Sequence, residues 1–470
     1  MGPLWMARIR CRSALSWGAS FTEGQTRKME DPVDPGGAQK KYGEGATRRS
    51  GRAARAPDDR IVGRVRKMRR LTIMFYLHSW LPHVSGITMR YKAIFDHLVA
   101  NGYGIILLTP YADSPEYHGI TTVRIDGTRL FFMDDTTTHQ ANRIADPVFY
   151  AQTLRTCVDL CRTHRVDVIH CTYPDTMQAV CWTASRLLRV PLVSVVHTDV
   201  HAYLRAHRIP SSSRELALWL DRIAVALFPP DLLMYTSETF RRQDLATVHR
   251  PPALRTDVLP MYIDHGTFRP THPSHVCAWS RDSLRLLYVG RVEAEKSIED
   301  ILHAMTPITM SLVVVGEGAE RARLAQLARA MGVDVRFVGT VAHDQLAGWY
   351  SSADIFVQPS STETLGFTTV EALACGTCVV ARKAGGNTEV IAHEQTGILY
   401  RDVPHLRHLL QTTGATKRQR LASSGRKSVE HRTVDASVGY LRRQYQSLGP
   451  RPSVGDLAGL VFSFLRAVAM

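Results

Sequence analysis

The chain has no uninterrupted apolar run of the roughly 20 residues that a membrane-spanning helix requires. Its most apolar segment, residues 457–470, is shorter and contains Arg466, so it suits a helix that lies on a membrane or packs on the protein body. The eight cysteines also lack the spacing of a disulfide framework or of a paired metal site. We therefore expect buried thiols, including Cys375 and Cys378, and a reducing compartment.

Positive charge is distributed unevenly along the chain. Of the formal net charge of +15, residues 1–70 carry +10, from 17 Lys and Arg against 7 Asp and Glu. This basic extension is rich in Gly, Arg, Ser and Ala, which favours disorder over a packed core. Its Arg content is typical of an organelle-targeting segment and its acidic residues are not, so a targeting segment and a solvated tail both stay open. Because the excess charge lies in a tail without interleaved aromatic residues, we expect no nucleic-acid partner.

From residue 71 onward, apolar runs of strand length alternate with segments of helical spacing. The first half has expected strands at 71–75, 105–109, 168–171 and 192–196, and helices at 89–101, 148–164 and 176–188. After a polar break at 270–283, the expected strands are 284–289, 312–315, 335–338, 355–358 and 377–381, with helices at 298–305, 320–331, 343–350 and 369–374. This alternation predicts an α/β fold with two doubly wound, Rossmann-like domains. We assign them to residues 71–269 and 270–450, followed by an apolar tail at 451–470.

Ligands of doubly wound sheets bind beyond the carboxyl ends of the strands, so the loops that follow strands are informative. The first such loop, residues 290–297, turns at Gly290 and contains Arg291 and Lys296. An Arg fork and a Lys point charge suit a diphosphate, although basic residues beside a strand end are often only solvated. A second loop, Gly316-Glu317-Gly318, lacks the G-x-G-x-x-G spacing. A nicotinamide site is therefore disfavoured there, and a tight structural turn is the alternative to a nucleotide site.

The loop at residues 358–371 carries the most specific pattern. It leaves one strand and enters the next helix, and the N–H groups near Gly366 at the helix start form an anion site suited to phosphate. Glu363 lies in the loop and Glu371 in the first turn of the helix, with seven residues between them. The two carboxylates can therefore reach different hydroxyl groups of one ligand, a sugar on one side of the phosphates and a ribose on the other.

At these residues the sequence resembles the retaining glycosyltransferases of the GT-B fold, of the glycosyltransferase family 4 type, in which an E-x₇-E motif marks the donor site. The resemblance spans about residues 71 to 445 and is most specific over 284–400. The segments that make it most similar to the sulfoquinovosyltransferases of sulfolipid synthesis are 84–86, 196–198, 290–297, 361–366 and 381–387. Cys378 and Tyr262 depart from the proline and glycine usual at their positions. Asp199 and His201, which follow Thr198, are residues that can influence which acceptor is used.

This resemblance implies two Rossmann-like domains that face each other across a cleft, and a role for each site residue. The catalytic residues would be His197, Glu363, Arg291 and Lys296. The donor-binding residues would be Gly290, Arg291, Lys296, Gly316, Glu363, Leu365, Gly366, Phe367 and Glu371. Within this set the two cations would hold the diphosphate, Gly366 and Phe367 would donate main-chain hydrogen bonds, Glu363 would contact the sugar and Glu371 the ribose. The acceptor side would hold Gly86, His197, Thr198 and Asp199, with a neutral His197 facing the anomeric region.

The implied reaction is retaining transfer from a UDP-sugar to a lipid acceptor, most specifically of sulfoquinovose to diacylglycerol, with no cofactor. No Asp-x-Asp occurs in the chain, and with two cations in the cleft we expect no metal ion. The basic extension and apolar tail favour a peripheral membrane location, at the plastid envelope if residues 1–70 are a transit peptide and otherwise cytoplasmic. Because one scaffold serves many acceptors, a mannosyl- or glucosyltransferase acting on another lipid or a sugar stays open. So do an epimerase or phosphorylase on the same fold, and a non-catalytic nucleotide-sugar binder.

Overall fold

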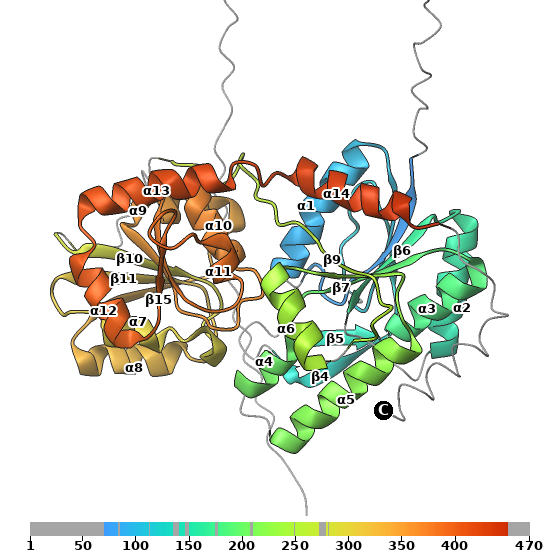
Figure 1. Cartoon of the computed structure of the whole chain (residues 1–470), viewed down its shortest axis with the longest axis horizontal. Coiled ribbons are helices and arrows are strands. Elements are labelled where there is room, and N and C mark those ends of the chain that lie inside the picture. Colours follow the sequence, from blue (N-terminus) through green and yellow to red (C-terminus); the bar gives the residue numbers. More distant parts are fainter. Residues whose placement is uncertain are drawn as a thin grey trace, which may run out of the picture. The chain divides into compact units, whose positions relative to one another are not determined.

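The computed structural model describes residues 70–82, 85–111, 113–134, 141–145, 150–173, 177–206, 210–248, 250–271, 279–280 and 282–449. The basic extension up to residue 69, Val84 of the 84–86 segment, the side chain of His201 and the tail at 451–470 lie outside these described residues. Two parallel sheets with helices on both faces organise the described part of the chain (Figure 1). The α/β fold with two doubly wound domains, predicted from the alternation of strands and helices, is confirmed.

The first sheet runs in the order β3-β2-β1-β6-β7-β8-β9, and all its neighbouring strands are parallel. Its strands are β1 (Thr72–Tyr76), β2 (Gly104–Thr109), β3 (Thr121–Arg124), β6 (Val168–Tyr173), β7 (Leu192–Val196), β8 (Leu232–Tyr235) and β9 (Thr256–Val258). An antiparallel hairpin, β4 (Gly127–Asp134) and β5 (Ala141–Ala145), follows β3. The helices of this half are α1 (Gly86–Ala100), α2 (Tyr150–Thr163), α3 (Met177–Leu188), α4 (Val200–Ala206), α5 (Ser211–Leu227) and α6 (Glu238–Val248).

The second sheet runs in the order β12-β11-β10-β13-β14-β15 and is also parallel. Its strands are β10 (Leu284–Val289), β11 (Met310–Val315), β12 (Asp334–Gly339), β13 (Ile355–Gln358), β14 (Cys378–Arg382) and β15 (Ile398–Tyr400). Its helices are α7 (Glu299–Ala304), α8 (Arg321–Met331), α9 (Leu346–Ser352), α10 (Phe367–Ala374), α11 (Asn387–Val390), α12 (Val403–Thr412) and α13 (Ala415–Val429), with single turns η3 (Ala294–Lys296) and η4 (His343–Gln345).

Burial on both faces explains why the central strands are continuous apolar runs. Every residue of β7 and of β11 is buried, as parallel strands covered by helices require. On the second sheet, α7, α8 and α12 pack into the core of one face, and α9, α10 and α11 into that of the other. On the first sheet, α1 packs on one face and α2 and α3 on the opposite face (Figure 1).

The last described helix, α14 (Val434–Ser447), returns to the first sheet. Its residues Val438, Leu441 and Tyr445 belong to the core that α1 forms with β1, although the stretch lies within residues 270–450, which the sequence analysis grouped with the second sheet. Apolar spacing shows that a helix has a buried face but not which sheet that face meets, and this is the reason for the difference. The helix begins at Thr433, whose side chain accepts from the Ala436 N–H.

The strand order of the second sheet reverses between β10 and β13. The chain proceeds from β10 outward to β12 and then returns to add β13 on the other side of β10. Loops that follow the two strands at such a switch point diverge and leave a crevice in which ligands bind. The loops after β10 and β13 are 290–297 and 359–366, which belong to two of the three loops that the sequence analysis singled out.

None of the helices in the described part of the chain combines the length and the apolar composition needed to cross a bilayer. Cys375 and Cys378 are both buried with free thiols, and burial raises the pKa of each to about 12. The expectation of buried thiols is therefore confirmed for this pair. Tyr262, which departs from the usual glycine, is also buried, and its hydroxyl donates to the carbonyl of Arg90 in α1.

Candidate active site

A direct ion pair joins the two loops at the switch point. Nζ of Lys296 lies 2.7 Å from Oε1 of Glu363, and both side chains are less than one fifth exposed. Ser360 adds a second link, since its hydroxyl lies 3.4 Å from the carbonyl oxygen of Glu295. The structure thus brings the cationic loop after β10 and the E-x₇-E loop after β13 into contact, as their place in the sheet requires.

The Glu363 carboxyl group of this pair is charged. Burial alone would raise the pKa of Glu363, but Lys296, Arg291 and a hydrogen bond from Ser360 together hold this pKa below its ordinary value. The carboxylate is therefore ionised at neutral pH, and its second oxygen can accept a further hydrogen bond. A lysine ammonium has three N–H donors, so one contact with Glu363 leaves donors for an anion beside it.

Arg291 is placed differently from Lys296. Its Nη2 donates to Oε1 of Glu295 at 2.8 Å, and its side chain is half exposed while that of Glu295 is buried. Arg291 still acts on the motif at longer range, because its charge contributes to the lowered pKa of Glu363. The structure thus puts Lys296 in contact with the motif and Arg291 beside it, and their role in holding a diphosphate stays a prediction.

Backbone contact explains the glycines of two loops. Gly316 has a φ of 136°, and a Cβ on it would lie 2.0 Å from the carbonyl oxygen of Gly290. Gly385 has a φ of 51°, and a Cβ there would lie 2.3 Å from the carbonyl oxygen of Glu363. Close packing thus accounts for Gly316 as a tight structural turn, and its part in donor binding stays a prediction. Gly385 fixes the loop that carries Glu363.

Helix α10 begins shortly after Glu363 in the same loop. Gly366 precedes the helix in the left-handed conformation, and Phe367 is its first residue. In the part of the chain that the structure describes, the N–H groups of Phe367 and Thr368 meet no backbone acceptor. Such unpaired N–H groups at a helix start are the donors that bind anions. Leu365, also expected in the donor site, is buried just before this turn.

Glu371, the second carboxylate of the motif, is buried within α10. Its Oε2 accepts from the Tyr350 hydroxyl at 2.8 Å, and its Oε1 lies 3.4 Å from Nε2 of His343. The two carboxylates therefore have separate partners, as their different predicted tasks require. The ribose contact of Glu371 stays a prediction.

His197 follows β7 in the first sheet and lies against the E-x₇-E loop. Its carbonyl oxygen accepts from the Thr364 hydroxyl at 3.1 Å, and its Nε2 lies 3.2 Å from the Tyr91 hydroxyl. Burial, reinforced by the charge of Arg90, holds the pKa of His197 well below its ordinary value. The imidazole is therefore neutral at physiological pH, as expected for a hydrogen-bonding role.

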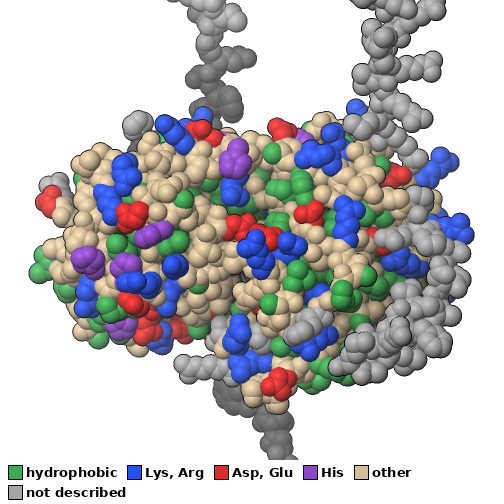
Figure 2. Space-filling model, viewed as in Figure 1, with side chains coloured by type: hydrophobic (Ala, Val, Ile, Leu, Met, Phe, Trp, Pro, Cys, Tyr) green, Lys and Arg blue, Asp and Glu red, His purple; other side chains and the backbone are tan. Residues whose placement is uncertain are grey.

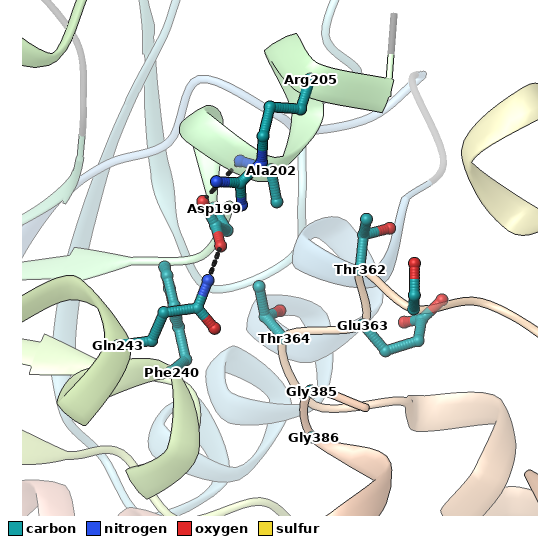
Figure 3. A pocket seen from close by; sticks show the side chains of 11 residues that line it. Asp199, Ala202, Arg205, Phe240, Gln243, Thr362, Glu363, Thr364, Gly385 and Gly386 are labelled. Atoms are coloured by element: carbon teal, nitrogen blue, oxygen red, sulfur yellow. Dashed lines mark hydrogen bonds between the residues drawn. The ribbon is translucent and has the colours of Figure 1, made fainter. Parts of the chain in front are cut away.

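A cavity of about 350 Å³ opens where these elements meet (Figure 3). The residues that line it are Asp199, Ala202, Arg205, Phe240, Gln243, Ser361, Thr362, Glu363, Thr364, Gly385 and Gly386. Asp199 is held in place by the Ala202 N–H at 2.8 Å and by the Gln243 side chain at 2.9 Å. The sequence analysis had pointed to Asp199 and Glu363 but missed Arg205, Phe240 and Gln243, because no motif marks α4 or α6.

Two more residues of the expected acceptor side lie nearby. Gly86 opens α1, and a Cβ on it would lie 3.7 Å from the ring of Phe367 at the start of α10. Thr198 is half-buried between His197 and Asp199. The Ser237 hydroxyl, which the sequence analysis missed, donates to the Thr364 carbonyl at 2.6 Å. Residues from both sheets therefore converge on the loop that carries Glu363.

Comparison with known proteins agrees with this geometry. A family model for "Glycosyl transferases group 1" matches residues 278–406, and one for "Glycosyl transferase 4-like domain" matches residues 85–261. The chain is 29% identical over 382 residues to a GDP-mannose-dependent alpha-mannosyltransferase of Mycobacterium tuberculosis, a match that covers 79% of this chain and 96% of that protein. It is 27% identical over 341 residues to the sulfoquinovosyl transferase SQD2 of Arabidopsis thaliana, covering 70% and 63%.

Solved structures share the fold. Sucrose-phosphate synthase from Thermosynechococcus elongatus superimposes with a TM-score of 0.65 at 22% identity, covering 80% of this chain and 99% of that one. HepE of Anabaena, in complex with UDP and glucose, gives a TM-score of 0.63 at 20% identity, covering 81% and 100%. The two family matches fall on the two sheets in turn and together span most of the described residues. The chain therefore belongs to the GT-B glycosyltransferases of the group 1 and 4-like type.

Proposed function

We propose that this glycosyltransferase is a retaining enzyme that moves a sugar from a nucleotide-sugar donor to a lipid acceptor. The observation that carries the proposal is the Lys296–Glu363 ion pair at the switch point, followed a few residues after Glu363 by the first N–H groups of α10, which meet no backbone acceptor in the described part of the chain. The donor diphosphate would lie against Lys296 and this helix start. The sugar would enter the cavity past Glu363, and the ribose would lie towards Glu371.

The chemistry proposed for the site is electrostatic. During retention the bond between the anomeric carbon and the diphosphate breaks, so negative charge builds on the diphosphate oxygens, which then take the acceptor proton on the face from which the diphosphate leaves. Lys296, with Arg291 behind it and the dipole of α10, would stabilise that charge in place. Glu363 would hold the sugar, and the neutral His197 would donate to one of its hydroxyl groups. These interactions strengthen as the bond breaks, so they would raise turnover more than affinity.

The transfer is proposed to need no metal ion. Lys296 and the start of α10 supply positive charge where the leaving group would lie, and no Asp-x-Asp occurs in the sequence. We expect the rate in excess EDTA to match that in untreated buffer. Loss of activity in EDTA that manganese restores would refute this part of the proposal.

For the donor we propose UDP-sulfoquinovose, with diacylglycerol as the acceptor. The loop segments quoted above and the relative SQD2 support this choice. Arg205, which lines the cavity together with Glu363, supplies a cation that suits an anionic sugar such as one bearing a sulfonate. The second candidate is a mannosyl transfer from GDP-mannose, which the longer match to the mycobacterial alpha-mannosyltransferase favours.

A peripheral membrane location is proposed with the lipid acceptor. On the face of the molecule in Figure 2, basic side chains are scattered among acidic ones and form no continuous stripe of the kind that tracks nucleic acid. The basic extension and the apolar tail would add charge attraction and apolar burial at an anionic bilayer. Flotation with anionic liposomes should carry the full chain upward, and recovery only in the soluble fraction would contradict this location.

A panel of UDP- and GDP-sugars, incubated with lipid extract and analysed by product mass, tests the proposal. A product that gains the sulfoquinovosyl mass only with UDP-sulfoquinovose supports it, and a mannosylated product with GDP-mannose replaces it by the second candidate. Donor that is epimerised without acceptor, or bound without any turnover, would remove the transferase assignment. Anomeric analysis of the product by NMR tests retention.

A further inference from the structure

A buried row of four hydrogen-bonded side chains ends at His197. Nε2 of His197 lies 3.2 Å from the Tyr91 hydroxyl, this hydroxyl lies 2.6 Å from Nε2 of His170, and Nδ1 of His170 lies 2.6 Å from the Tyr445 hydroxyl. We call these four residues the His–Tyr chain. They come from the end of β7, from α1, from β6 and from α14, and their exposed fractions range from 0% to 8%. The His–Tyr chain thus connects His197, beside the candidate active site, to α14, the last described helix.

Both imidazoles of the His–Tyr chain are neutral, so each carries one ring proton. Burial is the main reason, and it lowers the pKa of His170 to about 3 and that of His197 well below its ordinary value. Each tyrosine adds one hydroxyl proton. Three contacts must therefore be made with four protons, and each hydroxyl and each ring can donate only once.

One arrangement leaves none of the inner protons without an acceptor. In it the Tyr445 hydroxyl donates to Nδ1 of His170, Nε2–H of His170 donates to Tyr91, and the Tyr91 hydroxyl donates to Nε2 of His197. The proton of His197 is then on Nδ1. Among the described residues, Nδ1 of His197 has no hydrogen-bond partner, so this N–H is available to a ligand.

The reversed arrangement is less stable. It puts the proton of His197 on Nε2 and that of His170 on Nδ1, where it donates to Tyr445. The Tyr445 hydroxyl then has no acceptor among the described residues, while its side chain is 3% exposed. Each arrangement leaves one proton without an acceptor among the described residues. In the first arrangement that proton is on His197, the most exposed of the four side chains at 8%, where water or a ligand can accept it. An unpaired Tyr445 hydroxyl costs about 1–3 kcal/mol, which is enough to favour the first arrangement by about fivefold or more.

We propose that Tyr91, His170 and Tyr445 are positioning residues that fix His197 in the tautomer with its proton on Nδ1, so that this N–H is offered to a hydroxyl of the donor sugar. His197 lies beside the cavity, because its carbonyl accepts from Thr364, one of the residues that line it, and the sugar hydroxyl would lie at this edge of the cavity. The inference rests on the proposed role of His197 in transfer. It assigns a task to α14, which has no residue in the cavity.

The test measures the tautomer of His197 directly, by NMR of the full chain with ring-¹⁵N histidine. The His197→Gln variant assigns the signals. Tyr445→Phe removes the hydroxyl that sets the direction of hydrogen-bond donation along the His–Tyr chain. Tyr440→Phe is the matched control, because it removes a hydroxyl from the same helix that donates to Asp257 outside the chain.

In the wild type and in Tyr440→Phe we expect His197 to carry its proton on Nδ1. In Tyr445→Phe the two arrangements become nearly equal, so both tautomers should appear and kcat should fall about twofold, with little change in the KM for the donor. Tyr91→Phe, which frees the ring altogether, should lower kcat further. A wild-type proton on Nε2, or an unchanged tautomer in Tyr445→Phe, would overturn the proposal. If the tautomers mix but kcat stays constant, the His–Tyr chain stands and the role of His197 in transfer falls.

Discussion

The two sheets share one architecture and differ in what they place at the carboxyl ends of their strands. The second sheet ends in charged groups, with Lys296 paired to Glu363 and Arg291 to Glu295, beside the open start of α10. The first sheet ends in a neutral imidazole held by uncharged hydroxyl groups. Charge is therefore paired and concentrated where a diphosphate would lie, whereas the opposite wall combines this neutral imidazole with Asp199 and Arg205 at the cavity.

This difference has a physical basis. A buried charge is stable only with a partner, and the second sheet supplies carboxylates for its cations within its own loops. A neutral histidine needs no counter-ion, but it needs a fixed direction for its proton, which a hydrogen-bonded row can impose. The predictions below separate the two halves by removing one feature at a time.

Removal of the Glu363 carboxylate should have the largest effect. Glu363→Gln is expected to lower kcat by about 10²–10³-fold, the loss typical of one preorganised group, with little change in affinity for the nucleotide diphosphate. Glu394→Gln is the control, because Glu394 forms a 2.7 Å pair with Lys417 that is more exposed. Steady-state kinetics and calorimetry measure both variants. Equal losses in the two would contradict a special role for the buried pair.

A methyl group on Gly385 should be the next most damaging change. Gly385→Ala combines a left-handed φ with a contact of 2.3 Å to the Glu363 carbonyl, and we expect it to lower the free energy of unfolding by about 3 kcal/mol and to displace the loop. Gly332→Ala shares the left-handed φ but meets nothing within 4 Å, so it should cost about 1 kcal/mol. Urea unfolding compares them, and similar losses would show that contact with the loop is unimportant.

The buried histidine His170 of the first sheet should make stability depend on pH. The pKa of His170 is lowered to about 3 in the folded state, so the unfolded chain binds more protons between pH 3 and 6.5 and stability falls as pH falls through this window. From pH 7 to pH 5 this one group should reduce the free energy of unfolding by about 2 kcal/mol. Urea unfolding at both pH values should show a smaller drop in His170→Gln than in the wild type. His118→Gln is the control, because His118 is exposed. If His170→Gln lost as much free energy of unfolding between pH 7 and pH 5 as the wild type, the lowered pKa of His170 would be contradicted.

Glu371→Ala should have the smallest effect of the four changes. Loss of a carboxylate that binds the ribose is expected to weaken nucleotide binding about tenfold, equivalent to about 1.4 kcal/mol. Tyr350→Phe removes the hydroxyl that donates to Glu371 and keeps the carboxylate, so its affinity should stay close to that of the wild type. Calorimetry with UDP and GDP measures both. Unchanged affinity in Glu371→Ala would count against the ribose contact.

The sequence predicts the charged loops of the second sheet far better than the His–Tyr chain of the first sheet. Strands β7, β10 and β13 have the bounds expected from their apolar runs, and the switch point then brings residues 290–297 beside residues 359–366. Local pattern suffices there because each loop is one continuous segment. It did not show that Lys296 and Glu363 bind each other, since their contact joins side chains 67 positions apart.

The His–Tyr chain left no such signal. Tyr91 and His170 are 79 positions apart, and His170 and Tyr445 are 275 apart, on elements whose spacing indicates only burial. The cavity residues from α4 and α6 were missed for a related reason, because these helices carry no motif. Contacts of this kind depend on how the layers pack, which a single sequence does not encode in any local pattern.

The most direct test of the central claim is whether the diphosphate supplies the binding energy. Calorimetry would compare UDP with uridine and GDP with guanosine, in the wild type and in the double variant Lys296→Met with Glu363→Gln, which removes the pair without stranding a buried charge. We predict that the matching diphosphate binds the wild type at least about 100-fold more tightly than its nucleoside, and that the double variant loses about tenfold of this difference. Equal affinity for nucleoside and diphosphate in the wild type would contradict the account.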